Sequence, residues 1–272
     1  MLCVLVAVCA AALFAAYRRP ARVIADTPSE PAADETVELS YERLAGEAGE
    51  TPYLALVNKN FAAPDNAPDG LTLAAGSVKT LSVDCMMNGR ALEAFVKMFN
   101  DAAKIGYGGF RVTEGYRSFE YQKSLYDEAE DKAYVAEPGH SEHHAGLAAD
   151  ISYNGVNIAN SAQGRWLAAN AYKYGFTLRY AEDKESVTGI PYEPWHYRYV
   201  GQPHAYYLFE NGICLEEYAE YLKTDRKISV SFGGTDYTVY YLAGGEKIAI
   251  PADCSYSASA DNAGGIIVTA IN

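Results

Sequence analysis

Apolar residues spaced three and four positions apart predict a helix over residues 88–104. The apolar positions of this helix are Leu92, Phe95, Val96, Phe99 and Ala103. Gly106 follows them and is typical of a residue that ends a helix. The segment therefore presents one apolar face to a core and a polar face to solvent.

Other segments carry local signals of helices and strands. Residues 109–118, "GFRVTEGYRS", indicate a strand that leads into a turn, after which Ser118 can cap a helix. Ser161 can cap another helix, and Gly175 is a suitable residue to end it. A further helix is expected over residues 213–223.

The stretch "GLAADI" alternates as a strand does. Leu147, Ala149 and Ile151 fall on one face, which belongs to a core. The opposite face is nearly free of side chains until it ends in the carboxylate of Asp150. Small residues beside a carboxylate leave room for a metal ion with its substrate.

Residues 225–272 differ from the rest of the chain in their pattern of short β-prone runs. Short β-rich runs such as "KISVSF" and "YTVYYL" are separated by "GGTD", "GGE" and "DNAGG". A β-module of this size is marginal alone. We therefore expect the β-module to pack against the main domain, residues 51–224, or against a partner.

The N-terminal end divides into two segments. Residues 2–16 are an uninterrupted apolar run, shorter than the roughly 20 residues of a spanning helix and long enough for an export signal. No positive charge precedes the run, so we expect the natural start slightly upstream; a buried core helix is the alternative. We assign residues 1–22 to an anchor or signal segment. Residues 23–50, with eight acidic residues and one Arg, are predicted to be a flexible linker.

Net charge and cysteine content exclude some classes of function and of metal site. A formal net charge of −13 argues against a nucleic-acid-binding surface, which concentrates Lys and Arg. Beyond the apolar run lie Cys85, Cys214 and Cys254, an odd number without a C-x-x-C pair. Neither a disulfide framework nor a thiolate zinc site is indicated.

Three of the chain's five histidines lie within residues 138–150, "PGHSEHHAGLAAD". His143 precedes Asp150 by seven residues, and the intervening glycine allows the chain to turn so that both side chains meet. Nitrogen and oxygen ligands together suit Zn²⁺. A loop with hydrogen-bonded histidines is the alternative.

A second stretch, "EPWH", offers a third ligand in His196 and a carboxylate in Glu193. Three protein ligands leave a fourth position for water, which is typical of a catalytic zinc site. A carboxylate beside that water can take its proton and pass it to a leaving amine. Pro194 should keep this segment from being a regular strand.

These stretches resemble a known family. "SEHHAGLAAD" is similar to the S-x-H-x-x-G-x-A-x-D motif, and "EPWH" to the E-x-W-H motif, of VanY-like zinc D-alanyl-D-alanine carboxypeptidases. "LVNK" at 56–59 and "GYRSFEYQ" at 115–122 resemble two further family stretches, in the expected order. The resemblance covers roughly residues 53–205.

The resemblance implies an α+β fold with a central antiparallel sheet flanked by helices. It also implies one Zn²⁺ per chain, held by His143, Asp150 and His196. Glu193 would be the general base and acid. Ala145 departs from the family, which commonly has Thr before the motif glycine, but this leaves the ligands unchanged.

The resemblance further implies a substrate-binding role for Arg117, whose guanidinium would stabilise substrate and transition state. A surface arginine in a salt bridge is the alternative. Gln122 and Ser141 match family positions that line the substrate. The remaining histidines match no ligand position and are expected at the cleft edge or the surface: His140, His144 and His204.

The expected function is removal of the terminal D-Ala from peptidoglycan stem peptides, by a protein secreted from or anchored to the membrane of a bacterial cell. Rival activities are an L,D-carboxypeptidase on tetrapeptide stems and a D-Ala-D-Ala dipeptidase, which export disfavours. A zinc-stabilised cell-wall binding module without catalysis is a rival of another class. Glu193 argues against the last, because a structural site needs no base.

Overall fold

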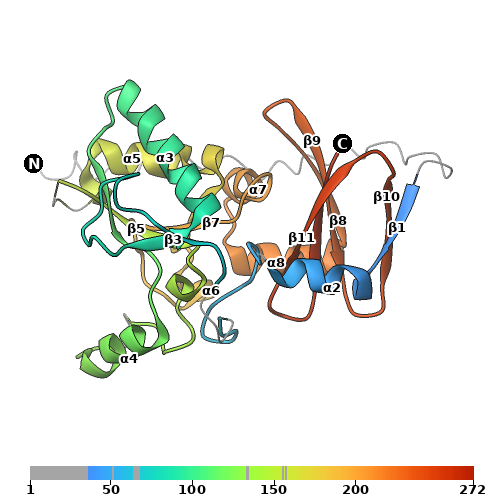
Figure 1. The fold of residues 1–272 in the computed structure, drawn as a ribbon, viewed down its shortest axis with the longest axis horizontal. Helices are drawn as coiled ribbons and strands as arrows, with labels where there is room; N and C mark the ends of the chain where they lie inside the picture. The colour runs from blue at the N-terminus through green and yellow to red at the C-terminus, as the bar shows by residue number, and fades with distance from the viewer. Residues whose placement is uncertain (1–35, 51, 64–67, 133–134, 155, 157) are drawn as a thin grey trace, which may run out of the picture.

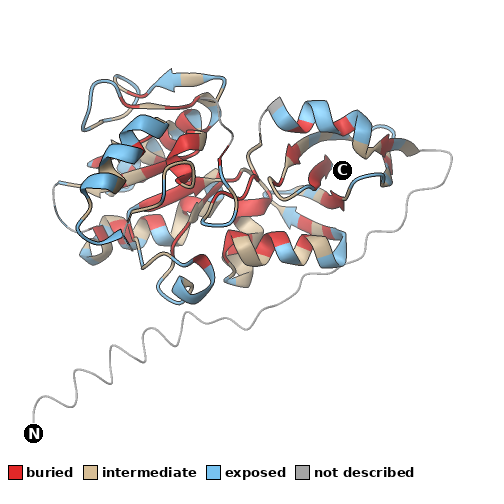
Figure 2. Cartoon of the chain, turned by 90° about the horizontal axis from the view of Figure 1, so that it is seen from below, coloured by how far each residue is buried: buried red, intermediate tan, exposed pale blue. Residues whose placement is uncertain are grey.

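Two lobes lie side by side in the computed structural model (Figure 1), which describes residues 36–272 except 51, 64–67, 133–134, 155 and 157. We call residues 52–225 the larger lobe, and residues 36–50 together with 226–272 the β-lobe. Figure 2 shows buried residues gathered inside each lobe. The segment predicted as an anchor or signal, 1–22, lies outside the described residues.

A four-stranded antiparallel sheet forms the centre of the larger lobe. Its strands, in spatial order, are β4 (Phe110–Glu114), β5 (Ala148–Tyr153), β7 (His196–Tyr199) and β6 (Phe176–Leu178). Side chains alternate across the sheet. The faces therefore separate a core side from a side that carries polar residues.

Helices α3 (Gly89–Lys104) and α5 (Ala162–Asn170) cover the core side (Figure 1). Leu92 and Phe95, two of the predicted apolar positions of α3, join Ile151 of β5 in one buried apolar cluster. The predicted position Ala103 is exposed, and Met98 and Ala102 are buried instead. The predicted α+β fold, with helices flanking an antiparallel sheet, is confirmed.

Local polar signals start the helices as expected. Ser118 accepts a hydrogen bond from the backbone N–H of Tyr121 and begins α4 (Phe119–Glu128). Ser161 caps α5 through the N–H of Gly164. The remaining elements of the larger lobe are β2 (Leu71–Leu73), β3 (Met86–Asn88), α6 (Glu185–Thr188), α7 (His204–Asn211), α8 (Leu215–Asp225) and the 3₁₀ turns η3 (Glu142–Ala145), η4 (Ile158–Asn160) and η5 (Ala171–Tyr174).

The β-lobe contains a second four-stranded antiparallel sheet. Its order is β11 (Ser255–Ala260), β12 (Ile266–Ile271), β9 (Thr235–Leu242) and β8 (Lys227–Phe232). The predicted β-module is therefore a real sheet. The remaining strand of the predicted β-module, β10 (Lys247–Pro251), does not join this sheet and pairs with β1 (Thr36–Ser40).

The partner of β10 comes from the segment predicted to be a flexible linker, and for residues 36–50 that prediction is wrong. Strand β1 (Thr36–Ser40) pairs antiparallel with β10, and α2 (Tyr41–Glu50) follows it. Leu39, Leu44 and Ala48 are fully buried in an apolar cluster with the β-lobe sheet. Glu42 and Glu47 are exposed on this helix, and this acidic composition hid the three core positions from the sequence analysis. Residues 23–35 lie outside the described residues.

The β-lobe packs against the larger lobe, as its small size led us to expect. Ile228 and Val230 of β8 share one buried cluster with Leu215 and Leu222 of α8. Among the residues that the structure describes, no helix combines the length and apolar character needed to cross a bilayer.

Candidate functional site

The structure brings together the three side chains predicted as metal ligands. Ligand atoms of His143, Asp150 and His196 all lie within 4.8 Å of one another. Asp150 on β5 stands directly opposite His196 on β7, and their Oδ1 and Nδ1 atoms are 3.2 Å apart. Nε2 of His143 lies 3.6 Å from the same Oδ1.

Gly146 makes the turn that carries His143 over Asp150. Its φ of +64° is a left-handed conformation that ends η3 just before β5 begins. A Cβ at this position would lie 2.7 Å from Cδ2 of Leu71, so even a small side chain would be crowded. The sharp turn allows two residues seven positions apart to approach the same point.

Hydrogen bonds on the outer sides of the two rings orient the imidazoles. Nδ1 of His143 lies 2.7 Å from the carbonyl oxygen of Gly115, which can only accept, so Nδ1 carries the proton. Nε2 of His196 lies 3.3 Å from Oε2 of Glu142. In the neutral rings that a metal requires, the lone pairs therefore lie on Nε2 of His143 and Nδ1 of His196, the nitrogens that face Asp150.

The donor set fits a zinc ion. Oδ1 of Asp150 is buried and accepts no hydrogen bond from the described residues, which is costly unless a cation lies beside it. Two imidazole nitrogens and one carboxylate oxygen are ligands that Zn²⁺ accepts. Burial lowers the pKa of His196, but the carboxylates of Asp150 and Glu142 outweigh it and raise this pKa to about 9. The site therefore favours positive charge.

Glu193 lies beside these ligands in the turn before β7. Its Oε2 is 3.6 Å from Nδ1 of His196. Burial raises the pKa of Glu193 to about 7, against the lowering effect of His196 and with a contribution from Asp150. A carboxyl group with a pKa near neutrality can both take and return a proton. The prediction that Pro194 keeps this segment out of the strand is confirmed, since β7 begins at His196.

Arg117 reaches the same site from the loop between β4 and α4. Its Nη1 donates to Oε1 of Gln122 at 2.7 Å, and its Nη2 pairs with Glu114 at 3.3 Å. Gln122 in turn donates to the carbonyl oxygen of Ala136 at 2.7 Å, so its amide is already engaged at both ends. The predicted contact of Gln122 with substrate stays a prediction, while its contact with Arg117 shows that it orients the guanidinium.

A cavity of about 470 Å³ opens over the three ligands. Ser141 lines it together with Arg117 and Gln122, as the resemblance implied for residues near the substrate. Apolar side chains form other parts of the wall: Leu125, Val135, Tyr180, Ile190 and Trp195. A cavity of this size is in the range that accommodates a short peptide end.

The other histidines are not part of the ligand cluster, but two of them are more buried than predicted. His144 is 8% exposed; its Nδ1 bonds the carbonyl oxygen of Arg117 and its Nε2 accepts from the N–H of Gly139. His204 is 4% exposed and joins Tyr218 to Thr269. A surface position is therefore wrong for both rings, because backbone groups of Arg117 and Gly139 bond His144, and the hydroxyl groups of Tyr218 and Thr269 bond His204.

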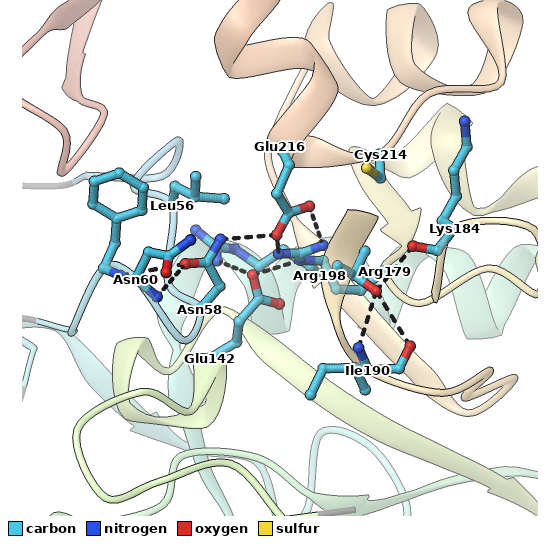
Figure 3. Close-up of polar contacts among 12 residues, drawn as sticks. Leu56, Asn58, Asn60, Glu142, Arg179, Lys184, Ile190, Arg198, Cys214 and Glu216 are labelled. Atoms are coloured by element: carbon cyan, nitrogen blue, oxygen red, sulfur yellow. Dashed lines mark hydrogen bonds and ion pairs between the residues drawn. The ribbon is translucent and has the colours of Figure 1, made fainter. Parts of the chain in front are cut away.

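The sequence analysis missed the charged residues behind His196. Glu142, Arg179 and Arg198 have fully buried side chains that form ion pairs (Figure 3). Burial raises the pKa of Glu142, but the two guanidiniums outweigh it and hold the pKa well below its usual range. The available signal was Arg198, which lies between two tyrosines on a strand and shares the face of His196.

Comparison with known proteins agrees with the geometry. The family model for D-alanyl-D-alanine carboxypeptidase of the VanY type matches residues 84–202. A D-alanyl-D-alanine carboxypeptidase of Enterococcus faecium is 41% identical over 191 residues, which are 70% of this chain and 63% of that enzyme. YodJ of Bacillus subtilis (strain 168), which its name places among the carboxypeptidases, is 41% identical over 186 residues, 62% of this chain and 68% of YodJ.

Solved structures extend the likeness. The vancomycin resistance D,D-dipeptidase VanXYg, crystallised with a D-Ala-D-Ala phosphinate analog, has a TM-score of 0.75 and 32% identity, covering 88% of this chain and 99% of its own. Because 88% of the chain is more than the larger lobe contains, this likeness extends into the β-lobe. The expectation that the resemblance stops before the β-module is wrong at the level of fold.

Two further structures match a smaller share of the chain. The LD-carboxypeptidase LdcB has a TM-score of 0.57 and 40% identity, covering 62% of this chain and 86% of its own. A variant of the D,D-pentapeptidase VanY in complex with Zn(II) has a TM-score of 0.54 and 34% identity, covering 61% of this chain and 98% of its own.

Proposed function

Because the chain belongs to the VanY family of D-alanyl-D-alanine carboxypeptidases, we propose that it is a zinc-dependent peptidase that removes the terminal D-Ala from peptidoglycan stem peptides. The observation that carries the proposal is the grouping of His143, Asp150 and His196 below a cavity, with Glu193 at its edge. The family motifs in the sequence predicted the same activity.

The three ligands would hold one Zn²⁺, which when bound supplies a Lewis acid that polarises the scissile carbonyl. Glu193 is placed to take a proton from the attacking water and to deliver it to the leaving amine. Burial raises the pKa of Glu193, which favours its accepting the proton of the water. Apolar side chains in the cavity wall, Trp195 and Tyr180 among them, lower the polarity around the reacting groups.

Arg117 supplies a reason for cleavage at a chain end. A base beside a metal would cut any accessible peptide bond, so the site needs a group that recognises the terminal carboxylate. The Arg117 side chain is 14% exposed and lines the cavity with its guanidinium held by Gln122 and Glu114. A fixed guanidinium can bind a carboxylate with two parallel hydrogen bonds.

Two other activities are favoured by particular matches. The 40% identity to the LD-carboxypeptidase LdcB supports cleavage of tetrapeptide stems. The match to the D,D-dipeptidase VanXYg over nearly its whole length supports hydrolysis of the free dipeptide. We retain the stem-peptide D,D-carboxypeptidase as the proposal because the family model and the Enterococcus faecium relative carry that activity in their names.

We also propose that the protein acts outside the cytoplasm of a bacterial cell, secreted or anchored to the membrane. The support is the apolar run at residues 2–16, whose length suits an export signal. Stem peptides of the cell wall lie in that compartment. Fractionation of cells that express the full chain, with the N-terminus of the product sequenced, tests both placement and cleavage.

The test of activity offers three substrates to the purified protein: stem pentapeptide, stem tetrapeptide and free D-Ala-D-Ala. Each is incubated with and without a chelator, and the released alanine is identified by mass spectrometry. We expect D-Ala from the pentapeptide, loss of activity with chelator and recovery on addition of Zn²⁺. Preferred cleavage of the tetrapeptide or the dipeptide would replace the proposal by the corresponding rival, and no cleavage of any would favour a binding module.

A further inference from the structure

Buried charged side chains extend from the candidate metal site to α8, the helix that leads into the β-lobe. Figure 3 shows the ion pairs of Glu142, Arg179, Arg198 and Glu216. Oε1 of Glu142 accepts from Nε of Arg179 and from Nη1 of Arg198, both at 2.8 Å. Arg179 also forms a two-pronged ion pair with Glu216, at 2.8 and 2.5 Å. The four groups carry two positive and two negative charges, so the buried set is neutral.

Four of the five N–H groups of Arg198 donate hydrogen bonds, one of them to Glu142. Its Nη2 donates to the carbonyl oxygens of Tyr53 and Ala55 at 2.9 Å each, and its Nε to that of Tyr199 at 3.1 Å. Each guanidinium is thereby held in one orientation, and Glu142 is held by both. Removing a partner from such a set leaves an uncompensated buried charge, which is strongly destabilising.

The two carboxylate oxygens of Glu142 contact different partners. Oε1 is occupied by the two guanidiniums, whereas Oε2 faces Nε2 of His196 at 3.3 Å. The ring of Tyr180 packs 4.8 Å from the His196 ring, and Arg179 lies 4.9 Å from the centre of the Tyr180 ring. The imidazole is therefore restrained by a carboxylate at its edge and by an aromatic ring that the same network supports.

The far end of the network lies on α8, the helix that leads into the β-lobe. Glu216 also accepts from Nδ2 of Asn58 at 3.0 Å, so a loop of the larger lobe and α8 are joined at this carboxylate. Leu215 and Leu222 of the same helix pack against β8 of the β-lobe. The position of α8 therefore helps to fix the side chain of Arg179. Through Arg179 it also affects the positions of Glu142 and His196.

We propose that Glu142 is a positioning residue that aims Nδ1 of His196 at the metal, and that Glu216 holds it in place through Arg179. The metal affinity of the larger lobe then depends on the helix that joins it to the β-lobe. This inference rests on the proposed metal site. Partners that orient a metal-ligating histidine typically contribute about 10- to 100-fold in metal affinity.

The test compares zinc dissociation constants, measured by competition with a chromophoric chelator, for the wild type, Glu142→Gln, Glu216→Gln and Glu220→Gln. Glu220 is exposed on the same helix and supplies a matched control for the loss of one carboxylate. We expect about 10- to 100-fold weaker zinc binding in Glu142→Gln. Several-fold weakening is expected in Glu216→Gln, with no change in the control.

Two further readouts separate positioning from general destabilisation. The absorption spectrum of the Co²⁺-substituted protein reports ligand geometry, and we expect it to change in Glu142→Gln and to be partly restored in Glu142→Asp. The melting temperature of the metal-free variants shows whether folding is intact. Should Glu142→Gln fail to fold, Glu216→Gln decides the question by the same two measurements.

Unchanged zinc affinity and an unchanged Co²⁺ spectrum in a folded variant would overturn the inference while leaving the peptidase proposal intact. Wild-type protein that binds zinc in the expected pattern but cleaves none of the three substrates would overturn the peptidase proposal and leave the positioning role standing. Absence of metal binding by the wild type would overturn both.

Discussion

Asp150 and His196, 46 residues apart in the sequence, face each other across adjacent antiparallel strands with Oδ1 and Nδ1 3.2 Å apart. The register between β5 and β7 produces this pairing, and a shift of one residue would send one of the two side chains to the opposite face of the sheet. The candidate ligand pair is therefore as rigid as the sheet that carries it.

The first prediction concerns the metal. Purified wild-type protein should contain close to one zinc per chain, and His196→Ala should lose most of it, because two remaining ligands bind zinc poorly. Elemental analysis after dialysis measures this directly. His140→Ala is the control, since Nδ1 of His140 bonds the carbonyl oxygen of Asn58 and the ring is not in the cluster. Full retention of zinc in His196→Ala would falsify the ligand assignment.

The second prediction concerns the proton carrier. Glu193→Gln should keep zinc and lose about 10²- to 10⁴-fold in kcat, since an amide cannot accept the proton of the attacking water. Steady-state kinetics with the preferred stem peptide, together with zinc analysis of the same sample, checks both halves. The neighbouring exposed Glu185→Gln should leave kcat unchanged. Turnover of Glu193→Gln at the wild-type rate would remove this residue from the mechanism.

The third prediction concerns recognition of the chain end. Arg117→Ala should lower kcat/KM by about 10²-fold or more, and Arg117→Lys should recover little, because a single ammonium cannot reproduce the two-pronged contact. Arg111→Ala, a change at an exposed position of β4, is the control.

The same role predicts that a stem peptide with an amidated C-terminus is a poor substrate for the wild type. Product analysis by mass spectrometry compares the amidated and the free-acid peptide. If the amidated peptide is cleaved at the same bond and rate, Arg117 does not read the carboxylate.

The fourth prediction concerns acid sensitivity at the junction of the lobes. Burial lowers the pKa of His204 from 6.5 to about 3, so below pH 6.5 the unfolded chain binds a proton that the folded protein rejects. This group therefore destabilises the fold progressively as pH falls from 6.5 towards 3, by up to about 1.4 kcal/mol per pH unit.

Urea unfolding of wild type and His204→Gln between pH 7 and pH 5.5 tests this, because the other titrating groups, Glu193 among them, are the same in both proteins. The free energy of unfolding should fall more steeply with decreasing pH in the wild type than in the variant. His140→Gln serves as the comparison for removing a half-buried histidine. Parallel pH profiles for wild type and His204→Gln would show that the ring is not kept neutral by burial.

The fifth prediction concerns the N-terminal strand and helix. Leu44 is fully buried on α2 against the β-lobe sheet, so Leu44→Ala should lower the free energy of unfolding by about 2–5 kcal/mol. The exposed neighbour Arg43→Ala should change it by no more than about 0.5 kcal/mol. Urea denaturation measures both. Equal stability of the two variants would mean that residues 36–50 contribute no core.

Short-range patterns were enough to predict the helix α3, the caps at Ser118 and Ser161, and the strand with Ile151 inward and Asp150 outward. Each depends on residues within a few positions of one another, because helix and strand periods and cap hydrogen bonds are local. The motifs around His143 and His196 likewise indicated which side chains meet, through their likeness to a family.

Contacts between distant parts of the chain determine the features that local patterns did not predict. Residues 36–50 read as a linker because the polar side of α2 dominates their composition, and strand β10, about two hundred residues away, is what makes Leu39 a core residue. Glu142 looked like any acidic residue of a loop. Its buried state depends on Arg179 and Arg198, 37 and 56 positions further along the chain, and the cost of burying its charge is offset only where the fold brings those two guanidiniums to it.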